Sequence, residues 1–158
     1  MSEPVPTVVC GIDDSPGGRA ALEEAVRIAA RRGARVRALL VYEPPEAWSA
    51  WSYGPAAAIP VPHPEVFEES ASKVAHEIVG AVLDRLSAEM PTMPEVEIEA
   101  LPGRPADVLV ENAGGAEALV VGHRGRGTLA SSFLGSTSLG CVLHAPCPVT
   151  VVPVPVPA

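Results

Sequence analysis

The chain has 158 residues, of which 47% are hydrophobic, and it carries a formal net charge of −8. This length and apolar content predict one globular domain over residues 1–158 with a sizeable buried core. The acidic balance argues against a nucleic-acid-binding protein with a broad basic surface. No apolar run approaches the roughly 20 residues that span a bilayer, and the N-terminus lacks the features of a signal peptide. We therefore expect a soluble, cytoplasmic protein that does not contact membranes.

The sequence contains three cysteines, Cys10, Cys141 and Cys147. Their number is odd, and their spacing does not match that of a zinc site. We expect small buried or half-buried thiols, with neither a disulfide framework nor a metal site.

The first half of the chain alternates aliphatic runs with helical patterns. The predicted elements are a strand over Thr7–Ile12, a helix over Gly17–Arg32 that Gly33 ends, a strand over Arg35–Tyr42, and a long core-facing helix over Glu65–Glu89. Residues 43–64 are rich in proline and predict a long irregular loop. We interpret its aromatic residues as covering an exposed edge and not as holding a ligand.

The second half continues the alternation. The predicted elements are an outer strand over Val96–Leu101, a helix over Pro105–Asn112, a buried strand over Ala118–Val121, a helix over Ser136–His144, and a fifth strand over Pro148–Val152. Strands that alternate with helices over the whole length predict an α/β fold. We expect an open, five-stranded parallel sheet of the Rossmann-like kind, with helices on both faces.

Ligands of such sheets bind outside the carboxyl ends of the strands, where the strand order reverses. If the first and fourth strands are neighbours, the loops at residues 13–16 and 122–135 face one crevice. The segment from Ala118 to the C-terminus contains no acidic residue, although it contains Arg124 and Arg126. A glycine-rich loop without carboxylates could tolerate a small anion. Composition alone does not distinguish this reading from a chance absence of acids in a short segment.

Several motifs that hold phosphates or perform catalysis are excluded by spacing. A P-loop requires a lysine in the loop, and the only lysine is Lys73, in the middle of a predicted helix. Residues 125–130 match GxGxxA, but they follow the fourth strand and no acidic residue comes after them to hold a ribose. Residues 136–140 lack the first glycine of a nucleophile elbow. The sequence therefore does not support a Walker-type phosphate site, a dinucleotide-binding site or the active site of a serine hydrolase.

The remaining pattern is Gly122-x2-Gly125-x9-Gly135-Ser136, which joins a strand end to a helix start. Glycines let backbone N–H groups converge on an anion without a side chain in the way. The helix that begins at Ser136 adds the positive end of its dipole and a hydroxyl donor. This arrangement could hold phosphates without any lysine.

Three stretches together resemble the universal stress proteins of the nucleotide-binding type. VVCGIDDSP resembles the opening strand and loop of that family, VVGHRGRGTLASSFLGSTS its G-x2-G-x9-G-[ST] loop, and HAPCPVTVV its closing stretch. The resemblance extends from Thr7 to Val152. It implies an adenine nucleotide alpha hydrolase-like sheet in the order 3-2-1-4-5, a homodimer, and ATP between the first loop and the glycine loop, with Mg²⁺ as an optional companion. The exposed VTVV edge of the closing stretch, Pro148 to Val154, predicts that the C-terminal strand pairs with its counterpart in that homodimer.

By position, the resemblance assigns the loop glycines and Ser136 to the phosphates, and Ile12, Asp13 and Val41 to the nucleoside. The candidate nucleotide-binding residues are Ile12, Asp13, Val41, Val121, Gly122, Arg124, Gly125, Gly135, Ser136, Thr137 and Ser138. We expect no catalytic residue and no protein-held metal. The chain departs from the family pattern in its long 43–64 loop and in its proline-rich tail.

These assignments leave alternatives open. Asp13 could act only as a helix cap, the arginines could be solvated loop charges, and Thr137 and Ser138 could be first-turn helix residues. The expected function is a stress-response protein that binds ATP as a regulatory ligand. The alternatives are an enzyme that hydrolyses ATP slowly, with Asp13 or Asp14 as base, and a dimeric scaffold that binds no nucleotide. ADP, AMP and cyclic nucleotides remain possible ligands.

Overall fold

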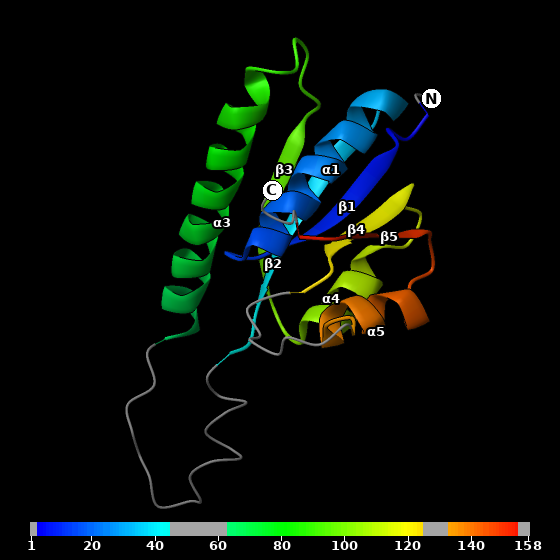
Figure 1. The fold of residues 1–158 in the computed structure, drawn as a ribbon. Coiled ribbons are helices and arrows are strands. Elements are labelled where there is room, and N and C mark those ends of the chain that lie inside the picture. Colours follow the sequence, from blue (N-terminus) through cyan, green and yellow to red (C-terminus); the bar gives the residue numbers. More distant parts are fainter. Residues whose placement is uncertain (1–2, 45–62, 125–132, 155–158) are drawn as a thin grey trace, which may run out of the picture.

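The computed structural model describes residues 3–44, 63–124 and 133–154, and Figure 1 shows their arrangement. The strands are β1 (Thr7–Ile12), β2 (Arg35–Tyr42), β3 (Val96–Pro102), β4 (Ala118–Gly122) and β5 (Val149–Val152). The helices are α1 (Pro16–Arg32), α3 (Pro64–Ser87), α4 (Pro105–Asn112) and α5 (Ser136–His144). All strand pairs are parallel, and the sheet order is β3-β2-β1-β4-β5. This confirms the predicted fold class and strand order.

The central strands β1 and β4 separate two apolar layers. Alternate side chains of β1 point to opposite faces, so Val8 and Cys10 pack with α1 and α3, whereas Val9 packs with Leu119 of β4, α4 and α5. Figure 1 shows α1 and α3 on one face of the sheet and α4 and α5 on the other. The residues of β4 from Ala118 to Val121 are all buried, as expected for a strand covered on both faces.

Helix α1 has defined caps at both ends. Ser15 is its N-cap, and the Ser15 hydroxyl accepts a hydrogen bond from the N–H of Gly18 at 3.0 Å. Gly33 ends the helix in the left-handed conformation, with φ 61°, and its N–H binds the carbonyl of Ala29. These caps explain why the predicted and observed ends of α1 agree within one residue.

Helix α3 covers the sheet with only part of its length. Its buried residues begin at Ala75, although the helix begins at Pro64. Val66 is 50% exposed and Val74 is 38% exposed. The prediction of a core-facing helix therefore holds for the second part of α3, whereas the first turns extend past the carboxyl ends of the strands (Figure 1). Helical periodicity shows which side of a helix is apolar, but not where the sheet beneath it ends.

The two edge strands differ in charge. β3 carries Glu97 and Glu99, which pair with Arg35 and Arg37 of β2 at 3.6 and 2.6 Å. β5, with the sequence VTVV, carries no charge and is half-buried throughout. Charged residues discourage an edge strand from pairing with another chain, so β5 is the edge better suited to such pairing.

The three cysteines are free thiols. Cys10 and Cys141 are buried and Cys147 is half-buried, which confirms the interpretation of these residues as small core groups. Burial raises the pKa of the Cys141 thiol to about 11. None of the helices in the described ranges combines the length and apolar character that a membrane crossing requires.

Candidate functional site

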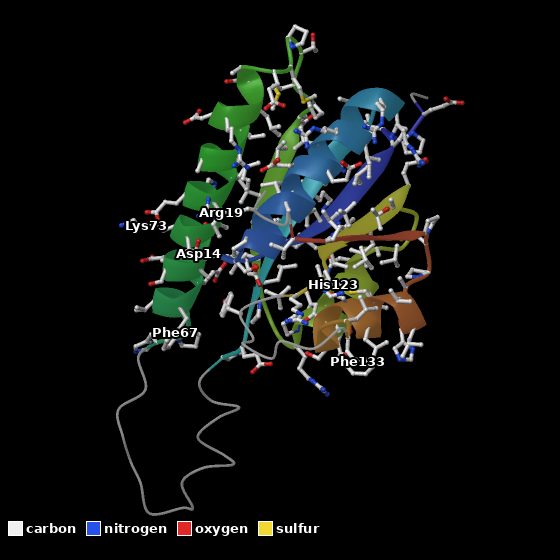
Figure 2. The ribbon with its side chains drawn as sticks, viewed as in Figure 1. Asp14, Arg19, Phe67, Lys73, His123 and Phe133 are labelled. Carbon is white, nitrogen blue, oxygen red and sulfur yellow. The ribbon has the colours of Figure 1, made fainter. Side chains whose placement is uncertain are left out.

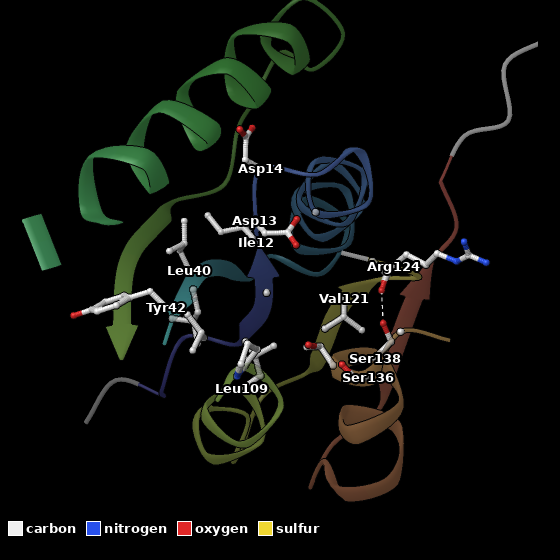
Figure 3. A pocket seen from close by; sticks show the side chains of 18 of the residues that line it. Ile12, Asp13, Asp14, Leu40, Tyr42, Leu109, Val121, Arg124, Ser136 and Ser138 are labelled. Atoms are coloured by element: carbon white, nitrogen blue, oxygen red, sulfur yellow. Dashed lines mark hydrogen bonds between the residues drawn. The ribbon is translucent and has the colours of Figure 1, made fainter. Parts of the chain in front are cut away.

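A pocket of about 840 Å³ lies at the carboxyl ends of the strands. It opens beside the junction of β1 and β4, where the chain leaves β1 toward α1 on one face and leaves β4 toward α5 on the other. Its volume is within the range of small-molecule sites. Figure 3 shows Ile12, Asp13, Val121, Ser136 and other lining residues around this space.

Every predicted site residue that the structure describes lines this pocket. They are Ile12, Asp13, Val41, Val121, Gly122, Arg124, Gly135, Ser136, Thr137 and Ser138. Gly125 and Arg126 lie outside the described residues, as do most of the predicted 43–64 loop and its three aromatic residues. The expected meeting of the first loop with the two described ends of the glycine loop is therefore confirmed.

The first wall of the pocket is a hydrogen-bonded turn at the end of β1. The carboxylate of Asp13 accepts hydrogen bonds from the N–H of Ser15, at 3.0 Å, and from the Ser15 hydroxyl. The same hydroxyl caps the N–H of Gly18. The side chains that precede α1 thus already bind backbone donors at its start. The N-cap is Ser15 and not Asp13, and the carboxylate of Asp13 holds the capping residue in place.

Asp14 follows Asp13 but has a different partner. Its carboxylate forms an ion pair of 2.8 Å with Arg19, and both side chains are partly exposed. Figure 2 shows the two residues close together near α3. Asp14 also lines the pocket, on the side nearer to α3. The two carboxylates therefore lie on one pocket but serve different local structures.

The second wall is the start of α5. The N-cap of α5 is Gly135, and within the described residues no side chain caps the first turn. The N–H of Gly135 donates to the carbonyl of His123 at 3.0 Å, which closes the neck of the glycine loop. The first N–H groups of a helix have no partner within the helix. This helix start therefore presents backbone donors and a positive dipole end to the pocket.

Ser138 has a structural role in this wall. It is 3% exposed, and its hydroxyl donates to the carbonyl of Gly122 at 2.5 Å (Figure 3). A serine hydroxyl has one proton, so this bond uses its donor. Ser138 thus holds the first turn of α5 against the end of β4, while Ser136 is exposed at the pocket.

The rest of the lining is largely apolar. β2 contributes Leu39 and Leu40, α4 contributes Leu109, and α3 contributes Ala71 and Val74. The contribution of α3 was missed from the sequence, because the whole helix was predicted to face the core. The sequence signal for this contribution was that the apolar side of α3 begins several residues before Ala75, where contact with the sheet begins. Two further lining residues just before α5 were also missed: Leu134 and Phe133, the second of which is labelled in Figure 2.

Charge around the pocket is mixed. Among its described lining residues, Asp13 and Asp14 are acidic and Arg124 is basic. An anion bound here could use the backbone donors at the start of α5, whereas at the start of α1 the N–H groups of Gly18 and Arg19 are already bound to Ser15. Within the described ranges, no three His, Cys, Asp or Glu side chains form a group that could hold a metal ion.

Comparisons with known proteins agree with this architecture. The model of the "Universal stress protein family" matches residues 5–153. A universal stress protein of Thermus aquaticus is 32% identical over 148 residues, covering 92% of this chain and 97% of that protein. One from Mycobacterium tuberculosis is 32% identical over 155 residues. This chain spans 47% of that relative's length.

Solved structures give the same result. A universal stress protein crystallised in complex with cAMP is 27% identical and has a TM-score of 0.66, with 95% of this chain and 98% of that chain covered. One from Archaeoglobus fulgidus in complex with dAMP is 21% identical and has a TM-score of 0.59, with 94% and 98% covered, and it shows the shared fold. From the family match, the sequence relatives and the common fold, we conclude that this chain belongs to the universal stress protein family.

Proposed function

We propose that this protein binds an adenine nucleotide, ATP in particular, as a regulatory ligand in the pocket between β1 and β4. The carrying observation is the start of α5, which faces the pocket without a side-chain cap. The related protein solved with cAMP, at 27% identity, supports an adenine nucleotide as the class of ligand. The regulatory role is part of this proposal and is supported by the membership of the chain in the universal stress protein family.

The two halves of the pocket suit the two halves of a nucleotide. Leu40, Val41 and Val74 offer apolar surface to a base. Gly122, Gly135 and Ser136 lie at the other side, where the helix dipole favours phosphate. The start of α1 is less suitable for phosphate because Ser15 and the carboxylate of Asp13 already occupy it. These observations support phosphates at the start of α5 and Asp13 beside the ribose.

Thermal melting of two variants with and without saturating ATP tests this placement. Ser136→Ala removes one charge-assisted hydrogen bond worth roughly 1.5–3 kcal/mol, or about 10- to 150-fold in affinity. Gly135→Val combined with Ser136→Ala also puts a side chain where backbone must approach phosphate. Gly135 has φ −62°, a conformation that valine adopts without strain. We expect both variants to lose most of the ATP-induced stabilisation.

Ser87→Ala is the matched control, because Ser87 lies at the end of α3 away from the pocket. This variant should keep the full ATP-induced rise in melting temperature. If Ser136→Ala melts lower than the wild type in the absence of ligand but keeps the whole ATP-induced shift, Ser136 is only a structural residue and the phosphate assignment is wrong. If the wild-type protein shows no shift with ATP, ADP, AMP or cAMP, the scaffold alternative replaces the proposal.

We also propose a homodimer formed through β5. This strand is an uncharged sheet edge, and α5 beside it exposes Leu139, Val142 and Leu143, at 46%, 47% and 65%. Symmetric pairing of two such edges would bury apolar surface and satisfy backbone groups at the same time.

A further inference from the structure

The start of α1 and the end of β4 pack backbone against backbone. A Cβ atom at Gly17 would clash with the carbonyl oxygen of Arg124. A Cβ atom at Gly122 would lie 2.7 Å from the carbonyl carbon and oxygen of Gly17. The contact therefore leaves no room for a side chain on either partner.

Local structure does not require glycine at position 17. Among the described residues, the glycines with positive φ are Gly33, Gly103 and Gly115, so Gly17 has a backbone conformation open to other residues. Glycine within a helix costs up to about 1 kcal/mol relative to alanine. Glycine is needed at position 17 because the chain that follows β4, at Arg124, lies too close for a side chain.

A side chain at position 17 would displace the carbonyl of Arg124, which lies on the phosphate side of the proposed site. Arg124 lines the pocket, and two hydrogen bonds tie the chain just before it to α5: Gly135 N–H to the His123 carbonyl, and the Ser138 hydroxyl to the Gly122 carbonyl. Displacement of the Arg124 carbonyl would therefore disturb the start of α5. The apolar side of the pocket, at Leu40 and Val74, has no part in this contact.

We propose that Gly17 is a positioning residue for phosphate: its missing side chain lets α1 approach the start of the glycine loop and so sets the shape of the phosphate part of the pocket. This inference rests on the proposed function. It gives a role in shaping the site to a residue of α1 that does not itself line the pocket.

Calorimetric titration with ATP and with adenosine tests it, using the wild type, Gly17→Ala and the control Gly80→Ala. A Cβ atom at Gly80, on the exposed side of α3, meets nothing within 4 Å. We expect Gly17→Ala to weaken ATP binding by about tenfold or more, the loss of one charge-assisted hydrogen bond, and to leave adenosine binding within about twofold. Gly80→Ala should bind both ligands as the wild type does.

A merely structural role would weaken ATP and adenosine equally, and that result would overturn the inference, as would unchanged ATP affinity. Gly122→Ala makes the same clash from the other side and should show the same selective loss. If both variants fail to fold, the contact is a requirement of the fold and the positioning role is rejected. A wild-type protein that binds neither ligand would instead reject the proposed function, and this inference with it.

Discussion

Asp13 and Asp14 are adjacent carboxylates with different surroundings. Asp13 is half-buried and binds the backbone and hydroxyl of Ser15, whereas Asp14 is exposed and pairs with Arg19. An exposed ion pair contributes at most about 1 kcal/mol. The structure thus makes Asp13 the carboxylate that shapes the wall of the pocket beside β1.

We predict that Asp13→Ala weakens ATP binding more than Asp14→Ala does. Asp13 directly follows β1 at the pocket, and its replacement would remove both an acceptor for the ribose and the support of the first loop. Replacement of Asp14 would remove only a solvated ion pair from the described contacts. Calorimetric titration of both variants compares them. Ser15→Ala is the control, since it removes the N-cap at a cost of about 1 kcal/mol but keeps the carboxylate. Equal, small effects of the two aspartate variants would remove Asp13 from the ribose site.

At the scale of single elements, two exposed glycines show how position decides the effect of one substitution. Gly33 ends α1 with φ 61°, and Gly80 lies inside α3. We predict that Gly33→Ala lowers the free energy of unfolding by about 1–2 kcal/mol, because alanine is strained in the left-handed region. Gly80→Ala should raise it by about 0.5–1 kcal/mol, because helical glycine loses more backbone entropy.

Urea denaturation of both variants measures these changes. Neither glycine has a neighbouring atom within 4 Å of an added Cβ, so packing contributes little to the difference. A destabilised Gly80→Ala, or a Gly33→Ala as stable as the wild type, would contradict the assigned caps and helix interior.

Most elements could be predicted from the sequence because their signals are local. β1 and β4 are unbroken aliphatic runs, and Gly33 and Pro16 mark the ends of α1. The extension of α3 past the sheet could not be predicted, since it depends on where other strands end. The same reason hid Gly17, whose need for glycine arises from contact with Arg124, a residue more than 100 positions away in the chain.

The site likewise has features that could be predicted from local sequence and features that could not. The glycine spacing and the chain order placed Gly122 and Gly135 on one pocket correctly. The sequence did not distinguish the hydroxyl of Ser138, which donates to the fold, from that of Ser136, which is exposed at the pocket. It also left open which of the residues after β1 caps α1, and only the backbone conformation shows that this is Ser15.

For the whole molecule, the backbone of β5 shows how a dimer can be tested. The carbonyl of Pro148 accepts a hydrogen bond from the N–H of Leu119 in β4, and that of Val152 accepts one from His123, directly after β4. Because backbone groups alternate sides along a strand, those of Val149 and Val151 point to the open edge. Proline at position 151 would therefore remove an outward N–H group and spare the ladder to β4.

We predict that Val151→Pro shifts the protein from dimer to monomer in sedimentation velocity, while Val151→Ala, which loses side-chain packing but keeps the N–H group, stays dimeric. Dimers in both variants would place the interface elsewhere. A monomeric wild type would reject the dimer itself.

The central claim is that an adenine nucleotide binds at the carboxyl ends of β1 and β4, against the start of α5. Titration of ¹⁵N-labelled protein with ATP, followed by amide chemical shifts, tests both the ligand and its location. We predict saturable changes at residues 12–14, 121–124 and 135–138, and little change at Thr7, Arg35 and Val96, at the opposite ends of their strands. Changes confined to that opposite edge, or none at millimolar ATP, would contradict the account.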